Sequence, residues 1–258
     1  MKKWQLKIFC VFLGFAFLLA FSGAANAEVY MKQKRHTDET KVMGKTQPAK
    51  DEIVITWLGK DKARMDFDQD KSTIILLDKN VIISLDHTKM TYTEMQIGEW
   101  EKTIEESMNK EAKTDEDKEG AKKALGFLKG LKSLVKFETK VTETKEAKRI
   151  KDWNCRKYIL KTNMPMVKLT SEIWATEDIQ VDFNLYRKIS NAMMAGLPGM
   201  QESLKEMEKI KGVMVYSESS GSAMGANVKS TDELLEIADK TAPAGAYEIP
   251  KGYTKAKA

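Results

Sequence analysis

Cysteine, histidine and proline are scarce in this chain, and the scarcity of cysteine limits how the fold can be stabilised. The 258 residues include 2 cysteines, 2 histidines and 5 prolines. Cys10 lies within the first 27 residues, so only Cys155 remains if that segment is removed, and no intramolecular disulfide can then form. We expect Cys155 to be a buried, inert thiol, and a reactive or dimer-forming thiol is the alternative.

Sequence signatures of catalysis and of metal binding are missing as well. The chain has no glycine-rich phosphate loop, no dinucleotide fingerprint and no G-x-S-x-G elbow. Asp66-x-Asp68-x-Asp70 begins like a calcium loop, but Lys71 stands where the loop needs glycine and Leu77 where it needs glutamate. Histidine and cysteine show no ligand spacing, and a copper site built from methionines is a minor alternative. We therefore predict no enzymatic activity, no catalytic residues, no cofactor and no metal site.

Long apolar runs are confined to the N-terminus, where the sequence has the layout of a secretory signal peptide. Three lysines precede the apolar run 8–21, and Ala25-Asn26-Ala27 follows it as an Ala-x-Ala cleavage site. The run is short for a transmembrane helix, and an uncleaved membrane anchor is the alternative. We expect residues 1–27 to be a Sec signal peptide cleaved after Ala27, and we predict a periplasmic location.

A strong excess of charge of either sign is also absent. The formal charge of +5 falls to +2 without the three lysines of the N-terminal segment, which leaves 40 basic and 38 acidic residues. Nucleic-acid binding requires a concentrated basic face, so we predict no nucleic-acid partner. Residues 28–258 are long enough to bury a substantial core, and we expect a single domain.

Strand patterns are abundant in the remaining sequence. From residue 53 to 95, β-branched and alternating segments are separated by turns of a few residues, which requires antiparallel hairpins. The predicted strands are 53–58, 63–68, 73–77, 81–85, 90–95, 137–144, 155–161, 169–175 and 212–220. The segment after Asn227 is typical of a further strand, although 231–239 fits a helix equally well.

Two segments have helical spacing and are predicted as helical insertions. They are the charged segment 99–135 and the segment 183–211, which is interrupted at Gly196-Leu197-Pro198-Gly199. If these helices cover the apolar face of the meander as a hinged lid, that face lines a cavity; if they pack onto it, they complete a solid core. The predicted cavity residues are Trp57, Met65, Phe67, Ile75, Leu77, Ile83, Leu85 and Tyr92, and the predicted lid residues are Met193, Leu197 and Met200.

Several of these strands resemble the central hairpins of LolA-like proteins, the periplasmic carriers of outer-membrane lipoproteins and their relatives. The similar segments are 62–66, 73–80, 82–86 and 91–92. Within that group the chain is most similar to a family of uncharacterised secreted bacterial proteins, through segments 155–158, 172–174, 178–179 and 250–253.

The resemblance implies an α+β fold, in which an incomplete antiparallel β-barrel, or half-barrel, shelters an apolar cavity under a helical lid. It also implies that Arg64 ties the lid to the barrel. We therefore predict a periplasmic binding or carrier protein for a lipid, a lipoprotein acyl chain or another apolar ligand. Its partners would be an apolar small molecule or an acylated protein, with transient membrane or envelope-protein contacts. The alternatives are a non-enzymatic structural or interaction module with a filled cavity, and a metal-handling protein.

Overall fold

The computed structural model describes residues 28–42, 45–68, 70–99, 138–164, 167–181, 187–189, 191, 200–223 and 225–256. In this part of the chain 65% of the residues lie in strands and 6% in helices. The predicted α+β half-barrel with a helical lid is therefore wrong. The fold is nearly all β, it is dominated by one mixed sheet of 12 strands, and the helices among the described residues are short.

The strands follow one another along the chain with few breaks. They are β1 (Val29–Thr37), β2 (Thr40–Val42), β3 (Lys45–Gln47), β4 (Lys50–Leu58), β5 (Lys62–Phe67), β6 (Lys71–Leu76), β7 (Val81–Asp86), β8 (Thr91–Gln96), β9 (Glu138–Ile150), β10 (Trp153–Met164), β11 (Val167–Thr176), β12 (Val213–Ala223), β13 (Ala226–Asp239) and β14 (Thr254–Lys255). The nine strands predicted between residues 53 and 220 are confirmed, with ends that differ by a few residues.

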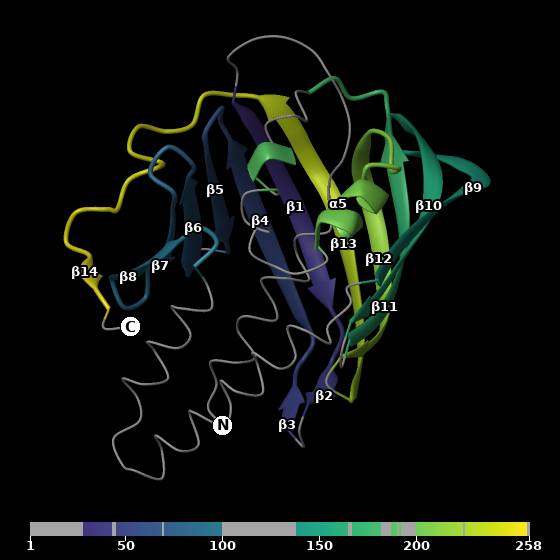
Figure 1. Cartoon of the computed structure of the whole chain (residues 1–258), viewed down its shortest axis with the longest axis horizontal. Coiled ribbons are helices and arrows are strands. Elements are labelled where there is room, and N and C mark those ends of the chain that lie inside the picture. The colour runs from purple at the N-terminus through teal and green to yellow at the C-terminus, as the bar shows by residue number, and fades with distance from the viewer. Residues whose placement is uncertain are drawn as a thin grey trace.

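Strand β1 joins the two halves of the large sheet. The strand order is β14-β8-β7-β6-β5-β4-β1-β13-β12-β11-β10-β9, so β1 pairs with β4 on one side and with β13 on the other. Neighbours pair antiparallel, as the short turns predict, except that β14 runs parallel to β8. The sheet is strongly curved, and β8 and β9 lie on opposite sides of the molecule (Figure 1).

The segment after Asn227 is a strand, which settles the alternative that the sequence left open. Residues 226–239 form β13, because both of its edges are paired, one with β1 and the other with β12. The turn into β12 depends on Gly212, whose φ is 84°. A Cβ there would lie 1.9 Å from the carbonyl oxygen of Thr176, so a larger residue would push β12 away from β11.

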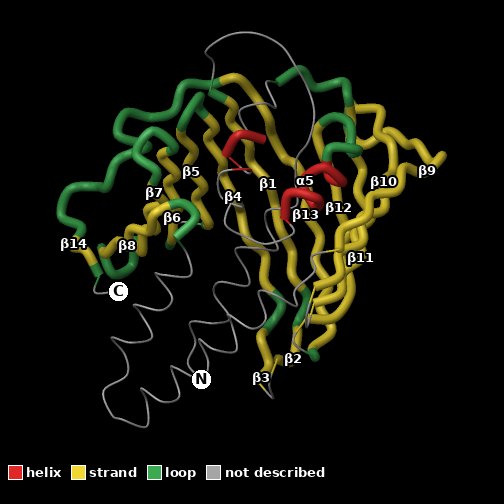
Figure 2. Tube along the Cα trace, in the orientation of Figure 1, coloured by secondary structure: helices red, strands yellow, loops and turns green. Residues whose placement is uncertain are grey.

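The helix α5 (Met200–Met207) is fastened to the sheet. It lies against the edge strand β9, where the Thr139 hydroxyl donates a hydrogen bond to Ser203 Oγ at 2.8 Å. The Val141 amide donates to the Glu206 carboxylate at 3.0 Å, which satisfies an amide that an edge strand would otherwise leave open. Figure 2 shows the described helical residues as short pieces along the sheet. A hinged lid over 183–211 is therefore not seen among the described residues, and the insertion predicted at 99–135 lies outside them beyond Glu99.

Apolar side chains pack on both faces of the sheet. We call the face that carries Met31, Leu58, Ala63 and Ile75 the concave face, and the face that carries Ile74 and Ile83 the outer face. On the concave face, the core continues across the sheet into a second cluster under α5, which contains Tyr158, Leu160, Ile173, Met214 and Ile210. The outer face is apolar chiefly on β6 and β7, where the C-terminal segment 240–256 covers it.

Candidate ligand-binding face

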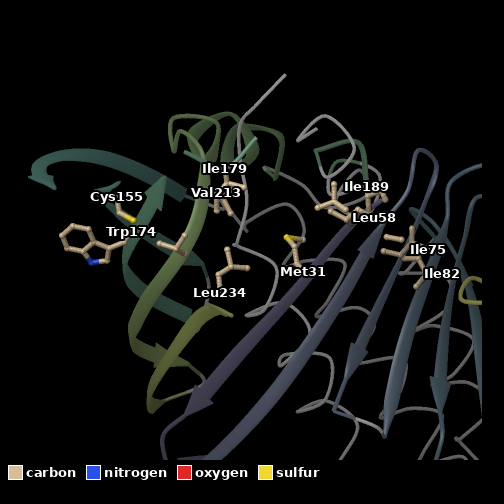
Figure 3. Close-up of a cluster of buried hydrophobic side chains, with 13 residues drawn as sticks. Met31, Leu58, Ile75, Ile82, Cys155, Trp174, Ile179, Ile189, Val213 and Leu234 are labelled. Atoms are coloured by element: carbon tan, nitrogen blue, oxygen red, sulfur yellow. The ribbon is translucent and has the colours of Figure 1, made fainter. Parts of the chain in front are cut away.

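The concave face is built in rows, because residues that pair across antiparallel strands point to the same side of the sheet. In the first row Val29 lies beside Leu58, and in the second Met31 lies between Thr56 and Ile237. Figure 3 shows the Met31, Leu58 and Leu234 side chains on the side of the sheet where Ile179 and Ile189 also lie. Several members of this cluster are almost fully buried, including Ile75, Val215, Ile189 and Leu234.

One flank of the concave face carries apolar side chains that are only partly buried. Met65 on β5, Leu77 after β6 and Met95 on β8 pack against the core cluster without being enclosed by it. Ile97 continues this flank beyond the end of β8. The flank therefore retains apolar surface that a ligand could cover, which distinguishes it from the closely packed centre of the sheet.

The structure brings half of the predicted cavity residues together on the concave face. Met65, Ile75 and Leu77 belong to its core cluster, and Phe67 points the same way because it pairs with the concave residue Val54. Phe67 is partly buried at the end of β5.

The remaining predicted cavity residues lie on the outer face. Ile83 and Leu85 are buried there, and Tyr92 packs against them. Trp57 also points outward, and its ring lies 4.7 Å from that of Tyr30, centroid to centroid. The prediction of one continuous apolar face through these residues therefore does not match the register.

The predicted lid residues contribute little to the described structure. Met193 and Leu197 lie outside the described residues. Met200 begins α5, the helix fastened to β9, and its side chain is not among those described.

Arg64 ties the C-terminal segment to the outer face of the sheet. Its Nε donates to Asp66 Oδ1 at 2.7 Å, Nη1 to the carbonyl oxygen of Ala246 at 2.8 Å and Nη2 to Ser72 Oγ at 3.0 Å. Among the described residues it makes no contact with a helix, so its observed role differs from the lid contact that the resemblance implied.

Ser72, His87 and Asp66 lie together on the outer face, an arrangement that no local motif in the sequence announces. Ser72 Oγ donates to Asp66 Oδ1 at 2.5 Å, and His87 Nε2 lies 2.6 Å from the same hydroxyl. His87 Nδ1 contacts the hydroxyl of Tyr253, also at 2.6 Å. Ser72 is only 2% exposed, and its hydroxyl donates a hydrogen bond to Asp66 and accepts one from Arg64, so it has no open approach for a substrate. The group fastens the C-terminal segment to the sheet.

A row of charged and polar side chains crosses the concave face beyond the apolar rows. Glu52 on β4, Arg35 on β1, Asp232 on β13 and Ser217 on β12 are direct cross-strand neighbours. We call these four residues the polar row. Arg35 Nε donates to Asp232 Oδ1 at 2.8 Å, and the two side chains are only 14% and 10% exposed. No sequence pattern marks this row, because its members come from segments far apart in the chain.

Burial governs the electrostatics of the polar row. Desolvation raises the pKa of the Asp232 carboxyl, and the nearby Glu52 carboxylate raises it further, while Arg35 acts in the opposite direction. Glu52 is itself paired with Lys50, with 2.6 Å between Oε1 and Nζ. The row therefore holds a guanidinium between two carboxyl groups in a largely water-excluded place.

The remaining candidates are a metal cluster, the free thiol and a membrane-spanning helix. The described residues contain no group of three or more histidine, cysteine, aspartate or glutamate side chains placed to hold a metal ion. Cys155 is buried, and burial raises the pKa of its thiol. Among the helices that are described, none has the length and apolar character needed to cross a membrane.

Comparison with known protein families gives a match over part of the chain. Residues 132–253 match a family described as a domain of unknown function, DUF4412. The match spans 122 of the 258 residues and takes in β9–β13 and the C-terminal segment as far as Tyr253. No curated protein matches the chain. The polar row is thus divided, with Asp232 and Ser217 inside the matched region and Arg35 and Glu52 outside it.

Proposed function

We propose that this protein is an exported, non-enzymatic binding or carrier protein that holds an apolar or acylated ligand against the concave face of its sheet. The observation that carries the proposal is the apolar flank formed by Met65, Leu77, Met95 and Ile97, which adjoins the buried core and is only partly covered. A curved sheet presents such side chains toward a common centre, as ligand-binding surfaces do. Export rests on the signal-peptide pattern of residues 1–27.

The energetics of acyl-chain binding are sufficient for a reversible carrier. Each buried methylene contributes about 0.8 kcal/mol, so a long chain supplies on the order of 10 kcal/mol before costs. Loss of translational and rotational freedom costs about 4–15 kcal/mol, which leaves a modest net affinity. Methionine at two positions of the flank allows repacking around chains of different shape, because its side chain is flexible and polarizable.

A second candidate is a structural or interaction module of the cell envelope with a filled interior. It is favoured by the close packing of the centre of the sheet, where Ile75, Val215 and Leu234 are each at most 1% exposed. Under this alternative the flank would be ordinary protein surface, and the protein would bind no apolar ligand.

Ligand analysis of the exported protein separates the two candidates. The full chain is expressed with its own N-terminal segment in a bacterial host, purified from the periplasm without detergent, and examined by native mass spectrometry. We expect an acyl-containing species that dissociates on collisional activation, together with Nile red binding in solution. Protein that carries no ligand and ignores Nile red and fatty acids would contradict the proposal and favour the structural module.

A charge introduced into the flank tests the location of binding. Met65→Lys places an ammonium group on the concave face and should weaken Nile red binding about 10-fold or more, because the charge must be desolvated on ligand binding. Ile159→Lys is the matched control, since Ile159 is also a partly buried strand residue but lies on the outer face of β10, between the concave residues Tyr158 and Leu160. Equal loss of binding in both variants would contradict a concave site.

A further inference from the structure

Arg35 has hydrogen-bonding capacity that the described residues leave unused. Its Nε donates to Asp232, but Nη1 and Nη2 have no hydrogen-bond partner among the residues that the structure describes. The side chain is 14% exposed, and it lies on the concave face with its neighbours in the polar row. Buried polar groups are normally hydrogen-bonded, so donors in this position are suited to water or to a ligand.

The polar row lies in line with the apolar rows of the same strands. The row beside it contains Gln33 on β1, Val54 on β4 and Phe67 on β5, which pair directly, and Met65 of the partly covered flank comes next on the same face of β5. Four residue steps of about 3.3 Å and two strand spacings of about 4.8 Å separate Arg35 from Met65, so the charged row and the apolar flank lie about 16 Å apart on one face. Such a face matches an amphiphile with a polar head and a long chain.

We propose that Arg35 is the anchor for the anionic head group, a carboxylate or a phosphate, of an acyl ligand whose chain lies on the apolar flank of the concave face. This inference rests on the function proposed above and specifies the ligand class of that same face. A guanidinium donates two parallel hydrogen bonds to a carboxylate or phosphate, whereas an apolar surface alone would not distinguish one head group from another.

The neighbouring charges are arranged so that the Arg35 donors stay available. Asp232 takes only Nε of the guanidinium, and Lys50 contacts Glu52 and also lies 3.3 Å from Asp68, measured from Nζ to Oδ2. Glu52 thus has a cationic partner other than Arg35. Recognition of an anion here depends on the direction of the Nη donors more than on a local excess of positive charge.

Head-group preference is measured with ligands that share one chain. Oleate and oleyl alcohol have the same hydrocarbon chain and differ in the charge of the head group, and inorganic phosphate has no chain. Each compound is titrated into the full-length protein with bound Nile red, at concentrations below the one at which the compound forms micelles. We expect oleate to bind about 10- to 100-fold more tightly than oleyl alcohol, the range for a hydrogen-bonded charged group, and phosphate to displace the probe weakly.

Variants of the ion pair assign the preference to Arg35. In Arg35→Gln/Asp232→Asn both members of the pair become neutral, so neither is left as an unpaired buried charge. We expect this variant to bind oleate and oleyl alcohol with equal affinity and to bind the alcohol as the unaltered protein does. Lys34→Gln is the matched control, because it removes one positive charge from the same strand at a half-exposed side chain whose Nζ lies 2.9 Å from Asp51 Oδ2, and it should keep the preference.

The possible outcomes separate this inference from the proposed function. Equal binding of oleate and oleyl alcohol by the unaltered protein, or a preference that survives in the double variant, would overturn the role of Arg35 and leave apolar binding intact. If phosphate displaces the probe as effectively as oleate does, the ligand is a free anion. That result would overturn the proposal of an amphiphilic ligand. Failure of both oleyl compounds to bind would overturn the proposed function, and this inference with it.

Discussion

Replacing Arg64 by alanine should release the C-terminal segment from the outer face and lower the stability of the protein. The guanidinium donates three hydrogen bonds, to a carboxylate, a backbone carbonyl and a hydroxyl, and the Arg64 and Asp66 side chains are 16% and 23% exposed. Removing one partner of a fully buried pair costs about 3–5 kcal/mol. Because this pair retains some contact with solvent, we expect Arg64→Ala to reduce the free energy of unfolding by about 3 kcal/mol.

Two further substitutions show whether the loss of stability depends on the hydrogen bonds and the burial of Arg64. Arg64→Lys keeps the charge but cannot form the fork of hydrogen bonds, so its cost should be about 1–2 kcal/mol. Arg156→Ala is the control, because Arg156 is 63% exposed and pairs only with Glu143 in the described structure. Its cost should be much smaller than that of Arg64→Ala, because solvent screens an exposed ion pair.

Urea unfolding followed by tryptophan fluorescence measures the series, and hydrogen exchange locates the effect. The amides of Thr254 and Ala256 donate to carbonyl oxygens of Met90 and Tyr92, and they should exchange faster in Arg64→Ala than in the unaltered protein. If Arg64→Ala costs less than about 1 kcal/mol and leaves exchange of these amides unchanged, then Arg64 does not fasten the segment and the reasoning is refuted.

Three further predictions concern the core, the free thiol and one surface turn. Leu234→Ala should lower the free energy of unfolding by about 2–5 kcal/mol in a urea titration, whereas Leu235→Ala, at a side chain that is 37% exposed, should cost under about 0.5 kcal/mol; similar costs would contradict the register. Cys155 should resist iodoacetamide in the native protein and react after unfolding, and rapid native labelling would contradict its burial. Asp86 accepts hydrogen bonds from Thr88 and from the backbone amide and side chain of Lys89, and these contacts lower its carboxyl pKa. A depressed native pKa adds stability above the unfolded value near 3.8, so Asp86→Asn should cost about 1 kcal/mol at pH 7 and progressively less as the pH falls below that value; a pH-independent cost in urea titrations would contradict this.

The hairpin pairing of β4 to β8 could be predicted from the sequence, because the turns that connect these strands are short. What could not be predicted was which face each strand turns toward the core. The four-residue turn after Leu76 pairs Leu76 with Val81, so Ile75 faces the same way as Ile82, and Ile83 faces outward with Ile74. The alternation of apolar and polar residues could not indicate which face is buried, because β6 and β7 are apolar on both faces.

The outer face of β6 and β7 is apolar because a segment far away in the chain covers it. Tyr247, Ile249 and Tyr253 cover Ile83 and Leu85, so these strands need apolar residues on both sides. A tail that packs across a sheet leaves no periodic signal of its own, and its role emerges only from tertiary contacts. The same limit applies to the polar row, whose four members lie on four strands and are separated by up to about 200 residues in sequence.

The prediction of a helical lid was wrong for a related reason. The spacing of apolar residues in 183–211 is a helical pattern, and α5 does form within it. Periodicity indicates that a helix has an apolar side, but it does not say what that side contacts. In the structure the contact is with β9, where Ser203 and Glu206 bind the edge strand, so the described helix belongs to the wall of the fold.

The most direct test of the account is photo-crosslinking with a fatty acid that carries a diazirine near the end of its chain. The labelled protein is digested, and the modified peptides are identified by mass spectrometry. We expect light-dependent adducts on the flank of the concave face, in peptides that contain Met65 or Met95, and competition by excess oleate. The absence of adducts, or adducts confined to the outer cluster around Tyr247 and Tyr253, would contradict it.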